Sequence, residues 1–215
     1  MGIELKNIEG NLSTKTGRLP TASFLLFKVY IEWDLIRREG GVFMSNTILS
    51  IRVLDESDAP IYQELRLNAL KTNPEAFGST YEREKQFSLD MVAERIKPSI
   101  DKFVLGSFNN SGSLVGTATF VRESNIKIAH KGNIYGMYIA PEYRGQGLGK
   151  ALMRELLKKA SQLEGLEQIN LTVVSNNQSA KKLYESVGFE VYGTERKALK
   201  FNGQYYDEDL MVCFL

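Results

Sequence analysis

A cluster of glycines is the part of this sequence whose residue types and spacing favour a specific chemistry. Gly145, Gly147 and Gly149 lie between an apolar segment typical of a strand and an amphipathic segment typical of a helix. The first N–H groups of a helix lack partners within the helix and carry the positive end of its dipole. Glycine lets such a backbone approach a bulky anion without interference from a Cβ atom. With Arg144 and Lys150 at its two ends, the turn is predicted to bind phosphate.

Spacing distinguishes the nucleotide-binding motifs that use such a turn. A P-loop has a glycine five residues before a Gly-Lys pair, and Ser or Thr after the pair. Here the pair is Gly149-Lys150, but Arg144 and Ala151 occupy the other two positions. A dinucleotide-binding fingerprint with glycine at 145 and 147 needs a third glycine at 150, where this chain has lysine. Both motifs fail, and the pattern left is Arg-x-x-Gly-x-Gly.

Two segments together resemble a known family. Residues 137–149 resemble the central motif of the GCN5-related N-acetyltransferase (GNAT) superfamily, and residues 177–189 resemble its second signature, Asn-x-x-Ala-x-x-Leu-Tyr followed by Gly-Phe. Residues 73–81 resemble a stretch found in bacterial members. The resemblance covers residues 47–215 and implies an α/β (α+β) fold. In that fold a mixed, mostly antiparallel central sheet is splayed at the cofactor strand and has helices on both faces.

The resemblance also implies acetyl-CoA as co-substrate, with no metal. Members of the family transfer its acetyl group to a primary amine by direct attack through a tetrahedral intermediate. Their glycine turn holds the pyrophosphate, and a bulged strand binds the pantetheine arm and the thioester carbonyl through its backbone. The cofactor-binding positions that match are Met137, Tyr138, Ile139, Arg144, Gly145, Gln146, Gly147, Leu148, Gly149, Lys150, Asn177 and Tyr184. A catalytically silent acetyl-CoA-binding regulatory module is the alternative.

Tyr184 matches the family tyrosine that acts as general acid toward the leaving thiol. A phenol of pKa about 10 can donate to a thiolate whose conjugate acid has a pKa near ~8.5. Asn177 matches the asparagine that contacts the pantetheine arm, and it is also a suitable helix N-cap.

The general base and the acceptor are less well defined. Residues 133–136, on the strand where many members carry a glutamate, contain no carboxylate. Glu75, Glu82 and the acidic run 207–209 are alternatives, as is a chain of water molecules. Aromatic side chains suggest an acceptor pocket with apolar walls, suited to a small-molecule amine or a protein amino group. These aromatic residues are Phe77, Tyr81, Tyr205 and Tyr206.

The elements that must position these residues alternate along the chain. Leu49, Ile51 and Val53 have the period of a half-buried strand. Asp58 is the expected N-cap of the first helix in the domain. Helices are predicted over residues 58–73, 88–98, 148–164 and 177–187. Further strands are predicted over 102–108, 114–122, 133–139, 169–173 and 207–214, with a hairpin turn at 109–112.

The composition excludes several classes of site and partner. A single cysteine and a single histidine exclude an intramolecular disulfide and a cysteine cluster, and disfavour a histidine-based triad. The net charge of +1 gives no reason to expect nucleic acid or an anionic membrane as partner. The apolar run 24–31 is too short to span a bilayer, and no signal peptide is recognisable. A cytoplasmic location is therefore expected.

The first 43 residues differ from the rest of the chain and form an N-terminal extension. Within them, residues 24–38 have the pattern of one amphipathic helix, followed by Gly40-Gly41. Under one interpretation Met44 is the natural start, and the preceding stretch is not native to the domain. Under the other, the extension packs on the domain or on a second copy of the chain in a homodimer.

Overall fold

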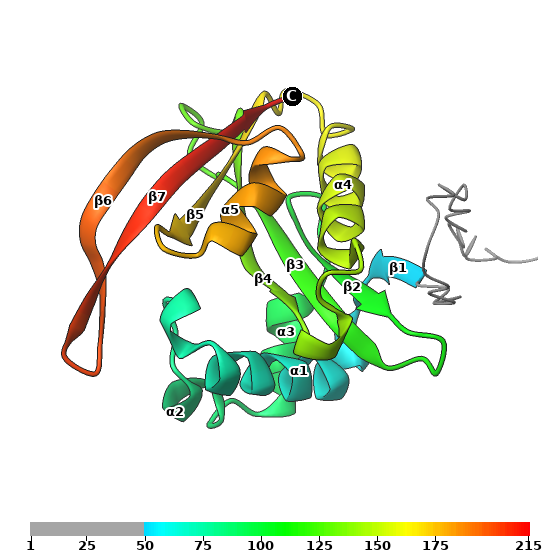
Figure 1. Ribbon diagram of the computed structural model, residues 1–215. Coiled ribbons are helices and arrows are strands. Elements are labelled where there is room, and N and C mark those ends of the chain that lie inside the picture. Colours follow the sequence, from blue (N-terminus) through cyan, green and yellow to red (C-terminus); the bar gives the residue numbers. More distant parts are fainter. Residues whose placement is uncertain (1–49) are drawn as a thin grey trace, which may run out of the picture.

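The computed structural model describes residues 50–215, which form a seven-stranded sheet in the order β1-β2-β3-β4-β5-β7-β6 (Figure 1). All neighbouring strands are antiparallel except β4 and β5, so the expected mixed, mostly antiparallel sheet is confirmed. The strands are β1 Ser50–Val53, β2 Lys102–Phe108, β3 Leu114–Arg122, β4 Lys131–Ile139, β5 Gln168–Val174, β6 Glu190–Phe201 and β7 Gln204–Phe214. The predictions for residues 1–43, Met44 and Leu49 lie outside the described residues.

Helices cover both faces of the sheet, as the family resemblance implies. On one face α4 (Leu148–Ala160) and α5 (Gln178–Glu185) pack through Leu152, Leu156 and Tyr184. On the other face lie α1 (Ala59–Thr72) and α3 (Leu89–Ile96), with the short α2 (Tyr81–Glu84) beside them. Three 3-10 turns complete the helical elements, at Glu56–Asp58, Pro74–Ala76 and Pro141–Tyr143. None of the described helices is long and apolar enough to cross a membrane.

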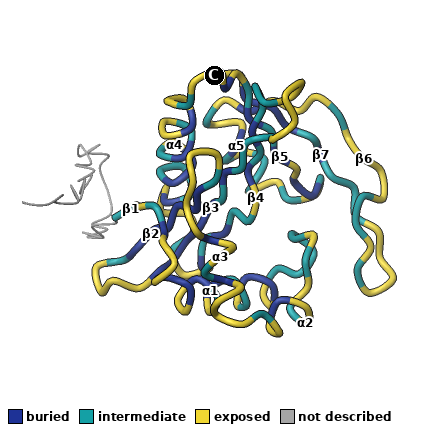
Figure 2. The backbone as a smooth tube through the Cα atoms, turned by 180° about the vertical axis from the view of Figure 1, so that it is seen from behind, coloured by how far each residue is buried: buried dark blue, intermediate teal, exposed yellow. Residues whose placement is uncertain are grey.

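The central strands are buried on both sides, which explains their continuous apolar runs. In β2, Phe103 and Leu105 belong to the core under α4, whereas Val104 between them belongs to the core under α1. Successive side chains of a strand point to opposite faces, so one strand supplies both cores. The buried segments in Figure 2 accordingly follow the middle of the sheet.

The sheet opens between β4 and β5. These parallel strands pair only over Lys131–Gln168, Gly132–Ile169 and Asn133–Asn170. Both strands continue beyond these pairs, to Ile139 and to Val174, and their arrows diverge in Figure 1. The expected splay at this strand is therefore confirmed.

The long hairpin of β6 and β7 is the largest difference from the predicted elements. Only residues 207–214 were expected to form a strand here, but residues 190–201 form another one. Asn202 and Gly203 connect the two strands with φ angles of +48° and +80°, as in a two-residue turn. The side chains of β6 are mostly exposed, and the hairpin projects from the body of the molecule (Figure 1), so β6 lacks the apolar alternation that reveals a half-buried strand.

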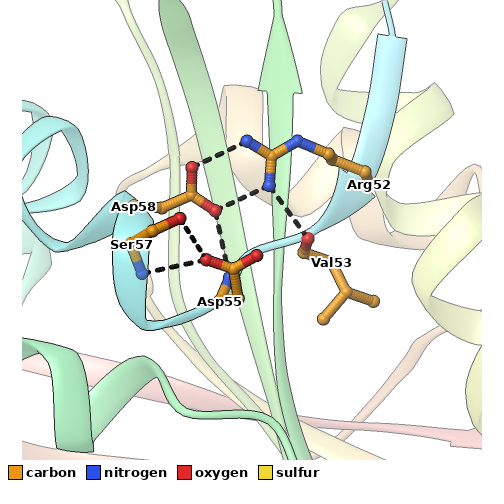
Figure 3. Close-up of polar contacts among 5 residues, drawn as sticks. All are labelled: Arg52, Val53, Asp55, Ser57 and Asp58. Atoms are coloured by element: carbon orange, nitrogen blue, oxygen red, sulfur yellow. Dashed lines mark hydrogen bonds and ion pairs between the residues drawn. The ribbon is translucent and has the colours of Figure 1, made fainter. Parts of the chain in front are cut away.

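The first helix begins differently from the prediction. Asp58 precedes α1, but its side chain makes no cap hydrogen bond to that helix. Its carboxylate instead accepts two hydrogen bonds from Arg52, of 2.6 and 2.7 Å, and one from the backbone N–H of Asp55 (Figure 3). The reason is the 3-10 turn before α1: Asp55 caps that turn by accepting from the N–H of Ser57, which leaves Asp58 to join β1 to the helix.

The helix after the glycine turn is also shorter than predicted. It ends at Ala160 and not near residue 164. Ser161 Oγ donates a hydrogen bond of 3.0 Å to the carbonyl of Lys158, and a turn follows. Gly165 has a φ of +71°, the conformation expected of a helix-ending glycine, but it ends this turn and not the helix.

Candidate functional site

A cavity of about 1070 Å³ lies where β4 and β5 separate. Its walls come from the second half of β4, the glycine turn, the start of α4, the end of β5 and the inner side of α5. On the opposite side of the sheet, α1 and the turn Pro74–Ala76 contribute. Residues from both predicted motifs thus meet at one cavity.

A β-bulge shapes the wall that β4 provides. Thr117 pairs with Tyr138 and Thr119 with Tyr135, so β4 contains one residue more than β3 between these pairs. Gly136 lies at this bulge with a φ of +60°, a conformation that glycine adopts without strain. Beyond Asn133 the edge of β4 that faces β5 has no strand partner among the described residues. The carbonyls of Gly136 and Ile139 accept hydrogen bonds from Thr117 Oγ1 and Arg144 Nε, and the other backbone N–H and C=O groups on this edge are open to a ligand.

The three β4 residues predicted to bind cofactor, Met137, Tyr138 and Ile139, all line the cavity. The Tyr138 ring is buried toward α1, where its hydroxyl lies 3.0 Å from Thr72 Oγ1. The half-buried Met137 and Ile139 pack on the other side, against the core under α4.

The glycine turn leaves the start of α4 open. Gly145 and Gly147 have φ angles of +73° and +79°, and Gly147 is the N-cap of α4 without any side-chain cap. Leu148, Gly149 and Lys150 form the first helical turn, and all three line the cavity. An uncapped helix N-terminus at a cavity is a favourable site for an anion.

Two polar side chains of the turn are engaged within the protein. Arg144 donates from Nε to the carbonyl of Ile139 and from Nη2 to Asn73 Oδ1, both at 2.8 Å. It lines the cavity and joins the end of β4 to the end of α1. Gln146 donates to the carbonyl of Glu142 at 2.9 Å and is not among the cavity-lining residues.

The second motif places two predicted residues at the cavity. Asn177 is the N-cap of α5, where its Oδ1 accepts from the N–H of Ala180 at 3.1 Å, and it also lines the cavity. Tyr184 lines the cavity from α5 with its side chain buried, and its ring meets the ring of Phe189 edge-on at 6.1 Å. Burial raises the pKa of Tyr184 to about 12, so the phenol keeps its proton at neutral pH.

The carboxylates considered as bases separate into two groups. Glu75 and Glu208 line the cavity, whereas Glu82 lies at a separate, smaller pocket. Asp207 is engaged by Arg196 and by the backbone N–H of Lys197, and Asp209 by Lys181, Ser175 and Thr194.

These environments move the pKa values of the acidic run in opposite directions. Backbone and side-chain hydrogen bonds lower the pKa of Asp207, and the hydrogen bonds from Lys181 and Ser175 lower that of Asp209. Burial, followed by the nearby charge of Glu195, raises the pKa of Glu208. Of these three residues, Glu208 lines the cavity, and its pKa is shifted toward the range in which a general base works near neutral pH.

Of the four aromatic residues predicted for the acceptor pocket, only Phe77 lines the cavity. Tyr81 lies at the smaller pocket, with the ammonium of Lys71 4.4 Å from its ring centroid. Tyr205 is exposed on the β6–β7 hairpin, and Tyr206 is half-buried there without lining the cavity. That expectation is therefore wrong for three of the four, because α2 places Tyr81 at the smaller pocket and the hairpin carries Tyr205 and Tyr206 away from the cavity.

A charged cluster on the α1 side of the cavity was missed from the sequence. Arg66 of α1 donates from Nε and Nη2 to the buried Glu84, at 3.0 and 2.8 Å, and Arg95 Nη1 lies 3.1 Å from the same carboxylate. Both arginines line the cavity. Helical spacing places Arg66 beside the buried Tyr62 and Ala69, and a charged residue on such an apolar stripe was the available signal.

Comparison with protein families identifies the fold. Residues 63–189 match the model of the acetyltransferase (GNAT) family. A solved GNAT-family acetyltransferase from Streptococcus pneumoniae superposes with a TM-score of 0.68 at 22% identity, over 78% of this chain and 99% of that one. A structure from Salmonella typhimurium, described as a putative acetyltransferase with its cofactor acetyl-CoA, superposes with a TM-score of 0.65 at 22% identity, over 80% and 95%. At these identities the superpositions show a common fold.

Curated relatives match shorter segments. The L-amino acid N-acetyltransferase AaaT of Escherichia coli is 31% identical over 101 residues, which is 47% of this chain and 62% of that protein. The spermine/spermidine N(1)-acetyltransferase of Bacillus subtilis is 34% identical over 67 residues, 31% of this chain and 41% of that protein. The chain thus spans less than two thirds of the length of either.

Proposed function

The chain belongs to the acetyltransferase (GNAT) family, and from that premise we propose that it transfers the acetyl group of acetyl-CoA to a primary amine of a small molecule or protein. The observation that carries the proposal is the cavity at the β4–β5 split, where the open N-terminus of α4 and Tyr184 face the same space. Acetyl-CoA supplies the acetyl group as a thioester, whose thiol is the leaving group.

The walls of the cavity suit the three parts of that co-substrate. The N–H groups of residues 148–150, at the positive end of the α4 dipole, would hold the pyrophosphate. The unpaired edge of β4, from the bulge to Ile139, would hydrogen-bond the pantetheine arm and the thioester carbonyl. Asn177 uses its Oδ1 for the α5 cap, which leaves the amide Nδ2 available for the arm.

Tyr184 acts on the departing sulfur. Its phenol, with a pKa of about 12, is protonated at neutral pH. Complete transfer of that proton to a thiolate, whose conjugate acid has a pKa near ~8.5, is uphill. We therefore assign to Tyr184 a hydrogen bond that stabilises the charge developing on sulfur.

Glu208 is the general base in this proposal. It lines the cavity on the side of the sheet opposite α5, and burial raises the pKa of its carboxyl group. An amine must lose a proton as it is acetylated, and a half-buried carboxylate with a raised pKa accepts that proton more readily than an exposed one.

The names of the relatives support a small-molecule amine as acceptor without choosing its class. One relative is named for L-amino acids and another for spermine and spermidine. These two classes differ in charge, because an amino acid is a zwitterion and a polyamine carries only positive charge.

The proposal is tested by incubating the full-length protein with acetyl-CoA and following CoA release. The panel of acceptors contains amino acids, polyamines and lysine-containing peptides, and mass spectrometry identifies the acetylated product. Amine-dependent release with an acetylated amine supports the proposal. Tight binding of acetyl-CoA without release on any acceptor would favour the alternative, a regulatory module that binds the cofactor without catalysis.

A further inference from the structure

One nitrogen of a buried arginine, Arg66, lacks a hydrogen-bond partner among the described residues on the α1 side of the cavity. The side chain of Arg66 is 10% exposed, and its Nε and Nη2 donate to Glu84. Its Nη1 is buried and has no hydrogen-bond partner among residues 50–215. An arginine has five N–H donors, two of them on Nη1, and leaving buried donors unpaired costs free energy. A ligand group that accepts hydrogen bonds would remove that cost.

The guanidinium is held in one orientation. The carboxylate of Glu84 accepts hydrogen bonds from Nε and Nη2. The central carbon of the guanidinium lies 4.6 Å from the centroid of the Phe77 ring. Burial acts to raise the pKa of Glu84, but Arg66, Ser79 and Arg95 outweigh it and lower that pKa to about 2. Glu84 therefore stays ionised and keeps Arg66 in place.

The unpaired Nη1 lies beside the bulge of β4. A Cβ atom built on Gly136 would lie 4.0 Å from Arg66 Nη1. Gly136 is the bulge residue, beside the stretch of β4 proposed to bind the thioester. A group bound to Nη1 therefore lies next to the reacting centre.

The local charge favours an anion. Arg66 and Arg95 share the single carboxylate of Glu84, so this cluster has a net charge of +1. Glu75 and Glu208 line other parts of the same cavity. A cavity with an unpaired guanidinium N–H donor and a net positive cluster at one place, and carboxylates at others, is complementary to a zwitterion and unfavourable for a polycation.

We propose that the acceptor is an α-amino acid and that Arg66 Nη1 binds its carboxylate. This inference rests on the proposed function, since it names the substrate class of the same site. In an α-amino acid one carbon separates the carboxylate from the amine. Binding of the carboxylate at Nη1 therefore places the amine beside the bulge, within the cavity that Glu208 also lines.

The test compares each of the nineteen standard α-amino acids that carry a primary amine with its own primary amide, using the full-length protein saturated with CoA. Calorimetry measures binding and does not depend on turnover. We expect the acids that bind to do so at least roughly tenfold more tightly than their amides, the effect of one charge-assisted hydrogen bond. In parallel acetylation assays the amide has the less basic amine, so faster reaction of the acid cannot arise from a larger fraction of neutral amine.

Two variants separate recognition from folding. Arg66→Lys keeps a cation beside Glu84 but removes the guanidinium Nη1. Arg52→Lys is the matched control, because Arg52 also forms a bidentate pair with a buried carboxylate, that of Asp58, but does not line the cavity. We expect Arg66→Lys to abolish the preference for acids over amides and Arg52→Lys to retain it.

The outcomes distinguish the two proposals. Equal binding of acids and amides, absence of binding by all acids, or an unchanged preference in Arg66→Lys would overturn the assignment of Arg66. If polyamines are acetylated and amino acids are not, the acceptor class is wrong while the proposed function stands. If acids bind selectively through Arg66 but no acceptor is acetylated, the proposed function fails and the role of Arg66 in recognition stands.

Discussion

Individual side chains at this cavity differ in how strongly their surroundings control their charge. Burial raises the pKa of both Tyr184 and Glu208. The phenol of Tyr184 therefore stays protonated at neutral pH, whereas the pKa of the Glu208 carboxyl group rises toward neutral pH. Asp207 and Asp209, the neighbours of Glu208, are held ionised by their hydrogen bonds. Burial is the largest cause of both shifts, and the shifts support the two unlike roles that we propose, a hydrogen-bond donor and a base.

Replacing Tyr184 with phenylalanine tests the donor. Tyr184→Phe keeps the ring against Phe189 and removes only the hydroxyl. We expect kcat to fall roughly ten- to hundredfold, the effect of losing a hydrogen bond to a developing charge, with the affinity for CoA nearly unchanged. Steady-state kinetics and calorimetry measure the two quantities. An unchanged kcat would remove Tyr184 from the proposed mechanism.

The pH dependence of the reaction tests the base. Glu208 accepts a proton only when ionised, so kcat/KM should rise with pH through a pKa above the ordinary value of 4.5 for a glutamate. Glu208→Gln should lower kcat/KM at neutral pH and eliminate this rising limb. Glu75→Gln, at the other cavity-lining carboxylate, is the comparison. If Glu75→Gln removes the limb and Glu208→Gln retains it, Glu75 is the base.

At the scale of elements, two backbone irregularities create the site. The bulge at Gly136 leaves an edge of β4 without a strand partner, and the left-handed glycines at 145 and 147 start α4 without a side-chain cap. Each leaves N–H groups of a rigid element available to a ligand. The proposed binding of acetyl-CoA depends on these groups and not on the side chains of Arg144 and Gln146, which bond within the protein.

A charge at the start of α4 should abolish this binding. Gly147→Glu places a negative group where we expect phosphates, and its backbone φ of +79° strains any larger residue. Gly147→Ala has the strain without the charge, and Gly112→Glu has both at a turn of φ +80° that is not among the cavity-lining residues. We expect CoA binding to be lost in Gly147→Glu, weakened in Gly147→Ala and unchanged in Gly112→Glu. Equal affinity in all three would contradict the phosphate site.

For the whole molecule, the cavity depends on the opening of one continuous sheet. Residues from both faces reach it only because β4 and β5 separate after Asn133 and Asn170. The described lining residues all fall between Tyr62 and Glu208. We propose that residues 47–215 are the acetyltransferase domain and that the extension of residues 1–43 is not needed for binding.

A chain that begins at Met44 tests this division. Because the cavity-lining residues are all retained, we expect it to bind acetyl-CoA within about twofold of the full-length affinity, without loss of turnover. Light scattering on both chains shows whether residues 1–43 contribute to a homodimer. Loss of binding or of soluble protein on truncation would show that the extension packs on the domain.

The sequence alone was sufficient for the family, the mixed sheet and the position of most elements. Local signals explain this success: the glycine spacing at 145–149, the Asn-x-x-Ala-x-x-Leu-Tyr pattern ending at Tyr184, and the apolar runs of the buried strands. The sequence did not predict β6, because its mostly exposed side chains lack the alternation of apolar and polar residues that marks a strand. The Asn202-Gly203 pair is nevertheless typical of a hairpin turn.

Tertiary structure alone decided which charged and aromatic residues share the cavity. Arg66 and Glu84 are 18 residues apart and meet only because α1 and α2 pack together, and Tyr205 leaves the site only because the hairpin of β6 and β7 projects outward. Helical spacing can mark Arg66 as lying on an apolar stripe, but its pairing with Glu84 and the position of Tyr205 depend on long-range packing, which no local periodicity encodes. The glycine turn therefore indicates the co-substrate from sequence, whereas the choice of acceptor depends on which side chains the fold brings to the other side of the sheet.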